Sequence, residues 1–131
     1  MMIVISACFG LVGVALGAVG EHMLAASLSA KQMKSFTTAV DYHQLYSVLI
    51  IGLELFRRFS PHNTLITRSM VIGFLLACSI FSGTIYAYLW TGIKGFIYVT
   101  PVGGFGLMGC WGYLAWRAYR VRRDLDKKEI S

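Results

Sequence analysis

Charge is scarce in this sequence. Only 14% of the 131 residues are charged, whereas 56% are hydrophobic, which exceeds the apolar share of an ordinary soluble domain. Cysteine is scarce too: Cys8, Cys78 and Cys110 stand singly with no C-x-x-C pair, which argues against a disulfide framework and favours small packing thiols. These scarcities favour a membrane protein over a soluble or disulfide-rich one.

The short motifs that carry chemistry are missing. The sequence has no nucleophile elbow, phosphate-binding loop, H-E-x-x-H motif or dinucleotide fingerprint, and no strand precedes the "GGFG" run at 103–106. We therefore expect no enzymatic activity and no cofactor. The net charge of +6 does not indicate nucleic acid, because the basic residues are concentrated after Arg117 instead of being interleaved with aromatic residues.

Long uncharged hydrophobic runs are what the sequence has instead. Residues 1–20 carry no charge, and a helix of that length crosses the ~30 Å hydrocarbon core of a bilayer at ~1.5 Å per residue. The predicted spans are residues 2–24, 36–56, 69–90 and 96–117. The expected fold is an all-α integral membrane bundle of four transmembrane helices, a single domain over residues 1–131 with a basic cytoplasmic tail at 118–131.

Two segments indicate where helices begin. "SLSAKQMKSF" holds a capping box, Ser29 with Gln32, and predicts a short interfacial helix between the first and second spans. "TPVGG" at 100–104 fits either a helix start, with Thr100 as the cap and Pro101 in the first turn, or a break within a longer helix.

The distribution of Lys and Arg predicts the orientation. Nine of the twelve fall in the 57–68 loop and from Arg117 to Lys128, whereas Lys31, Lys34 and Lys94 fall on the other side. The positive-inside rule then places both termini in the cytoplasm. Aromatic residues form expected belts at the two interfaces: Tyr86, Tyr88, Trp90 and Tyr98 outside, and Trp111, Trp116 and Tyr119 inside.

Small residues recur at helical spacing in three spans. Helices associate in lipid by close packing, so such stripes predict helix contacts, either within the chain or between chains. The predicted packing glycines are Gly10, Gly13, Gly17 and Gly20 in the first span, Gly83 in the third, and Gly103, Gly106 and Gly109 in the fourth. We expect a homo-oligomer or a membrane-protein partner.

Four motifs and a tryptophan carry a family resemblance. They are "ALGAVGEHML" (15–24), "TAVDYHQLY" (38–46), "FSGTIY" (81–86), and "TPVGG" (100–104) followed by Trp111. In this order and spacing, the chain resembles the domain of unknown function 423 family, YgdD-like small inner-membrane proteins of bacteria with a mitochondrial relative in animals. The resemblance implies a multi-pass four-helix protein of the bacterial inner (plasma) membrane, and it implies no particular activity.

Four ionisable residues, Glu21, His22, Asp41 and His43, fall near the outer boundary. Residues of these types can bind Zn or Cu or relay protons, and they can equally form a polar cap at the membrane interface. Adjacent residues, and residues two apart, lie on different faces of a helix, which favours the cap. We expect His22 to contact Asp41. By the family resemblance, Glu21 replaces an alanine, whereas His22 matches the motif.

Glu54 has basic residues three and four positions later, Arg57 and Arg58, so an ion pair on one helix face is predicted. Two function classes remain. The first is a non-enzymatic packing or assembly subunit, favoured by the glycine faces and the absence of a polar lining. The alternative is a small transporter, channel or metal- or proton-binding membrane protein that uses the outer cluster.

Overall fold

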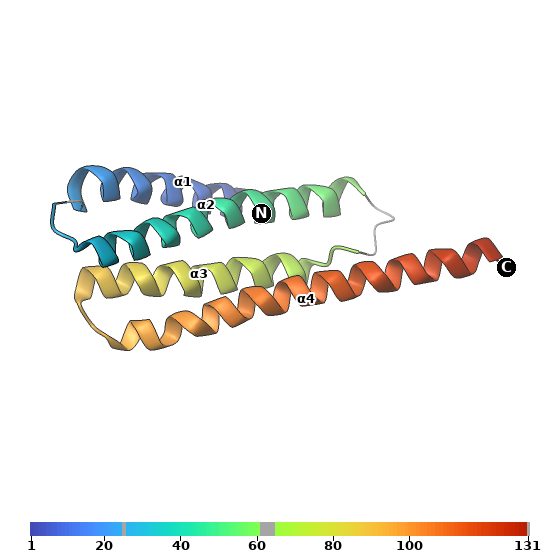
Figure 1. Ribbon diagram of the computed structural model, residues 1–131. Coiled ribbons are helices and arrows are strands. Elements are labelled where there is room, and N and C mark those ends of the chain that lie inside the picture. The colour runs from blue at the N-terminus through green and yellow to red at the C-terminus, as the bar shows by residue number, and fades with distance from the viewer. Residues whose placement is uncertain (25, 61–64, 131) are drawn as a thin grey trace.

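The chain folds into four helices that alternate in direction (Figure 1). The computed structural model describes residues 1–24, 26–60 and 65–130. The elements are α1 (Met2–Val19), the π-helical turn η1 (Gly20–Leu24), α2 (Ala30–Phe59), α3 (Arg68–Thr91) and α4 (Gly95–Ile130). No strand occurs within the described ranges, so the predicted all-α class is confirmed.

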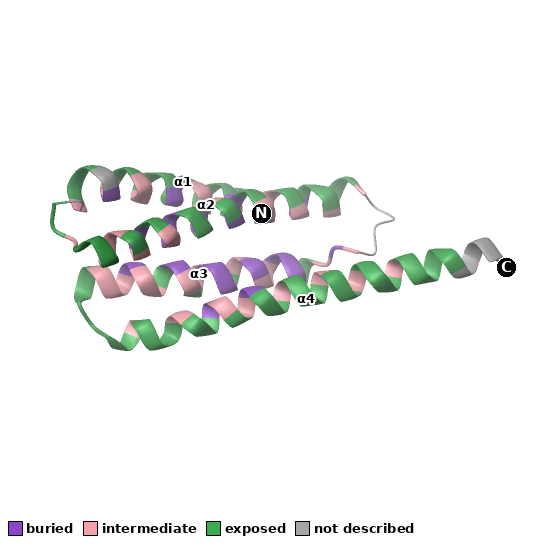
Figure 2. Ribbon diagram, in the orientation of Figure 1, coloured by how far each residue is buried: buried purple, intermediate pink, exposed green. Residues whose placement is uncertain are grey.

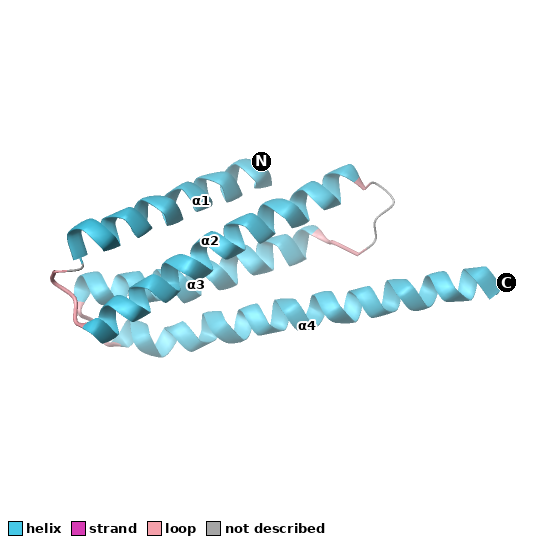
Figure 3. Ribbon diagram, turned by 45° about the horizontal axis from the view of Figure 1, so that its top comes forward, coloured by secondary structure: helices cyan, strands magenta, loops and turns pink. Residues whose placement is uncertain are grey.

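The helices pack in chain order as an open row: α1 lies on α2, α2 on α3, and α3 on α4 (Figures 1 and 3). The accessible surface is 8507 Å². A compact soluble protein of this size exposes about 6,900 Å². The excess arises because α1 and α4 each pack along one side and because the end of α4 extends beyond its neighbours. Figure 2 shows most of α1 and α4 exposed and the buried residues concentrated between α2 and α3.

The capping box begins α2 itself. Ser29 Oγ accepts a hydrogen bond from the Gln32 backbone N–H at 3.3 Å, and Gln32 Oε1 accepts one from the Ser29 N–H at 3.0 Å. The helix then continues without a break to Phe59, so the prediction of a separate interfacial helix is wrong. Phe36 and Val40, both buried, continue one apolar stripe from the first turns into the body of α2, which removes any reason to break the helix.

The helix-start interpretation of "TPVGG" is also wrong, because α4 begins at Gly95 and Pro101 lies inside it. Proline removes the ladder hydrogen bond to the carbonyl of Ile97 and its ring crowds that carbonyl, at a cost of about 3 kcal/mol in a helix interior, which the packing of α4 along α3 offsets. Thr100 does not cap the helix: its Oγ1 bonds back to the Phe96 carbonyl at 3.2 Å. At its other end α4 runs to Ile130, so the basic segment continues the same helix.

Helix α3 has an ordinary beginning and end. Thr67 Oγ1 accepts from the Met70 N–H at 3.3 Å, as an N-cap does. Gly92 follows the helix with φ +70°, and its N–H bonds to the Tyr88 carbonyl at 2.8 Å. Only glycine adopts this left-handed conformation freely, which ends α3 sharply and allows the short connection to α4.

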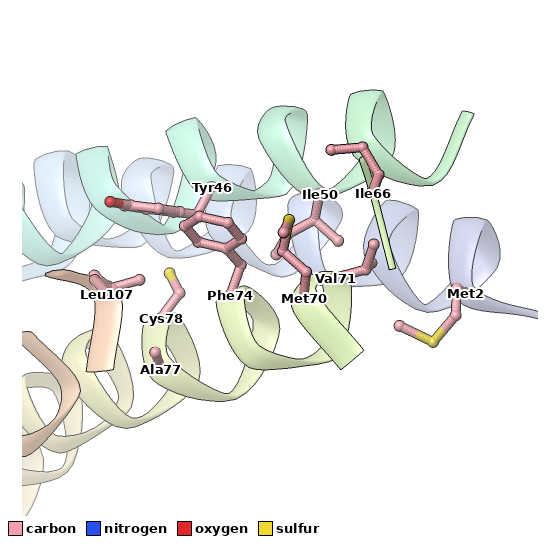
Figure 4. Close-up of a cluster of buried hydrophobic side chains, with 10 residues drawn as sticks. All are labelled: Met2, Tyr46, Ile50, Ile66, Met70, Val71, Phe74, Ala77, Cys78 and Leu107. Carbon is pink, nitrogen blue, oxygen red and sulfur yellow. The ribbon is translucent and has the colours of Figure 1, made fainter. Parts of the chain in front are cut away.

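The larger apolar core lies in the seam between α2 and α3 (Figure 4). Ile50, Val71 and Phe74 are fully buried there. The outer helices contribute little, α1 only Met2 and α4 only Leu107 among the buried members of this cluster. The seam therefore holds the row together, and α1 and α4 attach to it from the sides.

Two of the described helices are long and apolar enough to cross a membrane, Met2–Leu24 and Arg68–Thr91. They contain the predicted spans 2–24 and 69–90. The other two predicted spans, 36–56 and 96–117, lie within α2 and α4. These helices are less apolar, because α2 contains Asp41 and Glu54 and α4 is rich in glycine, tyrosine and tryptophan.

Candidate functional site

The described side chains place a polar seam where α1, α2 and α3 meet. His43, 4% exposed, directs Nε2 to the Phe9 carbonyl at 2.8 Å and Nδ1 to the Tyr86 hydroxyl at 3.4 Å. A backbone carbonyl can only accept, so Nε2 donates and Nδ1 is left to accept from tyrosine. Both nitrogens of a neutral imidazole are thereby satisfied, and the ring links three helices.

Glycine makes this contact possible. A Cβ on Gly13 would lie 3.2 Å from His43 Cδ2, and one on Gly10 would lie 3.3 Å from the Ser47 Cβ. Gln44 also reaches across, its Nε2 lying 3.4 Å from the Gly13 carbonyl. Because glycine has no side chain, the backbone of α1 lies close to α2, and its carbonyl oxygens can accept hydrogen bonds from polar side chains of α2. This is a chemical reason for the glycine stripe.

The same stripe continues to the end of α1. A Cβ on Gly17 would lie 3.3 Å from Val40 Cγ1, and one on Gly20 would overlap the Phe36 ring. All four predicted packing glycines of the first span therefore lie against α2. The π-helical turn begins at Gly20, where the buried ring of Phe36 occupies the space of the missing side chain.

The predicted glycines of α3 and α4 divide into two groups. A Cβ on Gly103 would overlap the backbone of Phe81, and one on Gly106 would lie 3.0 Å from the Ala77 Cβ, so both lie in the α3–α4 contact. Gly83 and Gly109 have no atom within 4 Å of the Cβ position. Gly73, which the stripes did not include, lies against Cys110, with 3.1 Å between its Cβ position and the sulfur.

Hydrogen bonds from side chains also join α2 to α3 and α3 to α4. Ser82 Oγ, which is buried, donates to the Ala39 carbonyl at 2.9 Å. The Thr84 and Thr100 hydroxyls lie 2.8 Å apart. Interhelical bonds of this kind stabilise helix pairs in lipid, where water does not compete.

Of the four ionisable residues predicted to cluster, the three whose side chains are described do not gather at one point. The side chain of Glu21 lies outside the described residues. His22 and Asp41 are exposed and line one groove of about 390 Å³ between α1 and α2. His43 points to the interior instead, because residues two apart on a helix face different directions.

No ion pair joins His22 to Asp41 in the described part of the chain. The residues described also contain no group of three His, Cys, Asp or Glu side chains placed to hold a metal ion. Tyr86 was expected in the outer aromatic belt, but it is 7% exposed and faces His43. Its sequence position gave no signal of that contact.

Glu54 forms the predicted ion pair. Arg57 donates to both carboxylate oxygens, at 2.9 and 2.8 Å, and Arg58 Nε donates to Oε1 at 3.1 Å. The carboxylate is fully buried beneath the two guanidinium groups. The hydrogen bond to Glu54 raises the pKa of Arg57 above its ordinary value, so this arginine stays charged.

These contacts define a class: an all-helical protein in which buried His43 and Ser82 bond to neighbouring helices while large apolar side chains remain outside. The chain belongs to the family described as "Protein of unknown function (DUF423)", whose model matches residues 16–104. The family resemblance carried by the sequence motifs is thereby confirmed.

Two relatives extend the match over most of the chain. The UPF0382 inner membrane protein YgdD of Escherichia coli (strain K12) is 30% identical over 124 residues, covering 93% of this chain and 92% of the relative. A UPF0382 membrane protein of Haemophilus influenzae is 29% identical over 110 residues, covering 83% and 86%. No solved structure matches the chain at a significant level.

Proposed function

We propose that the chain is a multi-pass protein of the bacterial inner membrane with a non-enzymatic role as a packing or assembly subunit. Its helices α1, α2, α3 and α4 would cross the bilayer at residues 2–24, 36–56, 69–90 and 96–117. The relatives named as membrane proteins support this, and so do the two membrane-length helices. Helices α2 and α4 pack antiparallel beside those two, which supports assigning them to the same layer of the bilayer.

The proposal includes an orientation with both termini in the cytoplasm. The end of α2, the start of α3 and the C-terminal part of α4 lie at one end of the row, and most basic residues belong to these segments (Figure 1). Lys31 and Lys94 belong to the opposite end. This segregation is typical of membrane proteins that follow the positive-inside rule.

Labelling of single cysteines with a membrane-impermeant maleimide tests the orientation. In a background with Cys8, Cys78 and Cys110 replaced by alanine, Lys94→Cys should react in intact cells and Arg122→Cys only after lysis. Reaction of Arg122→Cys in intact cells would contradict the orientation.

The assembly role rests on one observation, an unoccupied apolar face of α4. Phe105, Met108, Gly109, Gly112 and Trp116 lie at i, i+3, i+4, i+7 and i+11, and therefore on one side of the helix. The three large side chains are exposed, and neither glycine has an atom within 4 Å of its Cβ position. Small residues flanked by large apolar ones suit the close approach of another transmembrane helix.

Native mass spectrometry in mild detergent tests the assembly role, because it reports copy number and bound partners together. A dimer or a stable partner complex, lost in Gly112→Leu, is expected. A clean monomer from mildly solubilised membranes would contradict the proposal. Gly83→Leu, on α3, introduces the same side chain at another open position and serves as the control.

A further inference from the structure

A large groove lies between the first turns of α2, the second half of α3 and the first turns of α4. Its volume is about 1080 Å³, at the upper end of the range for ligand sites. We call it the lysine groove, because Lys31 and Lys34 line it together with the hydroxyls of Ser35, Thr38 and Thr100. Its apolar lining includes Phe81, Ile85 and Ile97.

A second hollow continues from the first toward the middle of the helices. It has a volume of about 330 Å³ and shares Phe81 and Pro101 with the lysine groove. We call it the apolar hollow, since none of its lining residues is charged; they include Tyr42, Gly104 and Trp111. Phe105 and Met108 also line it, so the hollow adjoins the α4 face proposed for assembly. Because they share Phe81 and Pro101, the two hollows adjoin, and we refer to them together as the path between α2 and α4.

The path ends where α2 and α4 meet directly. Trp111 Nε1 donates to the Tyr46 hydroxyl at 2.9 Å and bridges the two helices there. From Pro101 to Trp111, α4 advances about 15 Å, which is about half of the ~30 Å hydrocarbon core. The apolar hollow therefore extends along α4 for about the hydrocarbon thickness of one leaflet.

The charge at the open end of the path is unbalanced. Neither Lys31 nor Lys34 has an acidic partner within the described ranges, where the ion pairs are those of Glu54 with the two arginines at the opposite end. Asp41 lies on the α1–α2 side, in a different groove. Two ammonium groups above an apolar channel suit a ligand with an anionic head and a hydrocarbon chain.

We propose that this path binds one phospholipid with an anionic headgroup. The phosphate lies against Lys31 and Lys34, and one acyl chain follows the apolar hollow from Phe81 to Trp111. The inference rests on the four-span topology proposed above, because that topology places the lysines at the membrane surface and the hollow within the hydrocarbon.

Lipid retention by the full-length chain in mild detergent tests the site. Native mass spectrometry after addition of equal amounts of dioleoyl phosphatidylglycerol and dioleoyl phosphatidylcholine should show preferential retention of phosphatidylglycerol. In the Lys31→Gln/Lys34→Gln variant, the ratio of retained phosphatidylglycerol to retained phosphatidylcholine should fall by about fivefold for each lysine removed. The Arg122→Gln/Arg123→Gln variant loses the same charge on the far part of α4 and should retain the preference.

A second pair of variants tests the hydrocarbon part. Gly104→Leu should fill the apolar hollow and reduce retention of both lipids. A Cβ there makes an ordinary contact with the Phe81 ring, at 3.9 and 4.0 Å, and thermal unfolding of the variant checks that the rest of the side chain leaves the fold intact. Gly83→Leu on α3, an open position outside both hollows and outside the assembly face, should leave retention unchanged.

Equal retention of the two lipids, or equal loss in the Lys31/Lys34 and Arg122/Arg123 variants, would overturn the lipid site. A second copy of the chain cross-linked through the lysine groove, with no lipid retained, would overturn it too. Extraction with alkaline carbonate separates this failure from that of the topology: a chain released from membranes contradicts the topology, whereas a chain retained in them without lipid preference contradicts only the site.

Discussion

The contact between α1 and α2 and the contact between α3 and α4 both depend on glycine, but they use it differently. In the first, each of the four stripe glycines lies against a side chain of α2, and His43 and Gln44 bond to carbonyls of α1. In the second, Gly103 lies against backbone, while Gly109 faces open space. A glycine stripe therefore indicates close approach, and the neighbour decides whether that approach is polar, apolar or unused.

The sharpest way to break the α3–α4 contact is Gly103→Ala. The new Cβ overlaps the backbone of Phe81, which cannot rotate away, so α4 has to move. We expect a loss of about 3 kcal/mol in the free energy of unfolding, at the upper end of the cost of overpacking. Thermal unfolding in mild detergent measures it, and Gly104→Ala, which meets only the Phe81 ring at 3.9 Å, is the matched control.

The α1–α2 contact depends most on His43. Replacement by alanine leaves the Tyr86 hydroxyl without its partner and opens a cavity beside Phe9, so a loss of about 2 kcal/mol is expected. The same unfolding measurement applies. His22→Ala, at an exposed position, should cost little. Equal losses for the two histidines would show that the buried contact does not stabilise the protein.

Gly13→Ala should cost about 1 kcal/mol, because the methyl group crowds the imidazole at 3.2 Å and the ring is able to shift slightly. In the double variant with His43→Ala the crowding disappears, so the two losses should not add. A double-mutant cycle on unfolding free energy measures this coupling. Strictly additive losses would mean that Gly13 does not interact with His43.

The hydroxyl pair between α3 and α4 predicts a smaller coupling. Thr84→Val and Thr100→Val remove the 2.8 Å contact and keep the side-chain shape. The expected coupling is about 0.6 kcal/mol, the average for interhelical hydrogen bonds in a membrane protein. If the Thr84–Thr100 coupling energy equals that of the His43–Gly13 cycle, the α1–α2 and α3–α4 contacts are energetically alike and the contrast between them is wrong.

The smallest effect on stability is expected for Gly109→Leu. Its Cβ position has no neighbour within 4 Å, and leucine favours a helix more than glycine does, so stability should stay the same or rise slightly. Copy number or partner retention by native mass spectrometry should nevertheless fall. A large loss of stability without loss of assembly would place Gly109 in the intrachain contact instead.

Much of the local structure could be predicted from residues close together in the sequence. The Ser29–Gln32 capping box and the Glu54 pairing with Arg57 and Arg58 depend on neighbours within one helical turn, so spacing alone predicts them. The all-α class follows from the long apolar runs, and the family follows from motifs that the comparisons confirm.

Helix boundaries could not be predicted from the sequence where one continuous helix contains more than one possible start signal. The separate interfacial helix and the start at Thr100 both depended on local signals that occur inside or at the beginning of longer helices. In α2, burial of Phe36 and Val40 against the neighbouring helices favours continuity. Proline in α4 removes one hydrogen bond and its ring crowds the preceding turn, and the packing of α4 along α3 offsets this cost.

By itself, the sequence determined the helical class, the family, the segregation of basic residues and the contacts within single turns. Only the tertiary structure decided that His43 turns inward to Phe9 and Tyr86 while Asp41 faces a groove, and that Gly103 is covered while Gly109 is open. The physical reason is that spacing determines which residues share a helix face, whereas the rotation and pairing of the helices determine what that face meets.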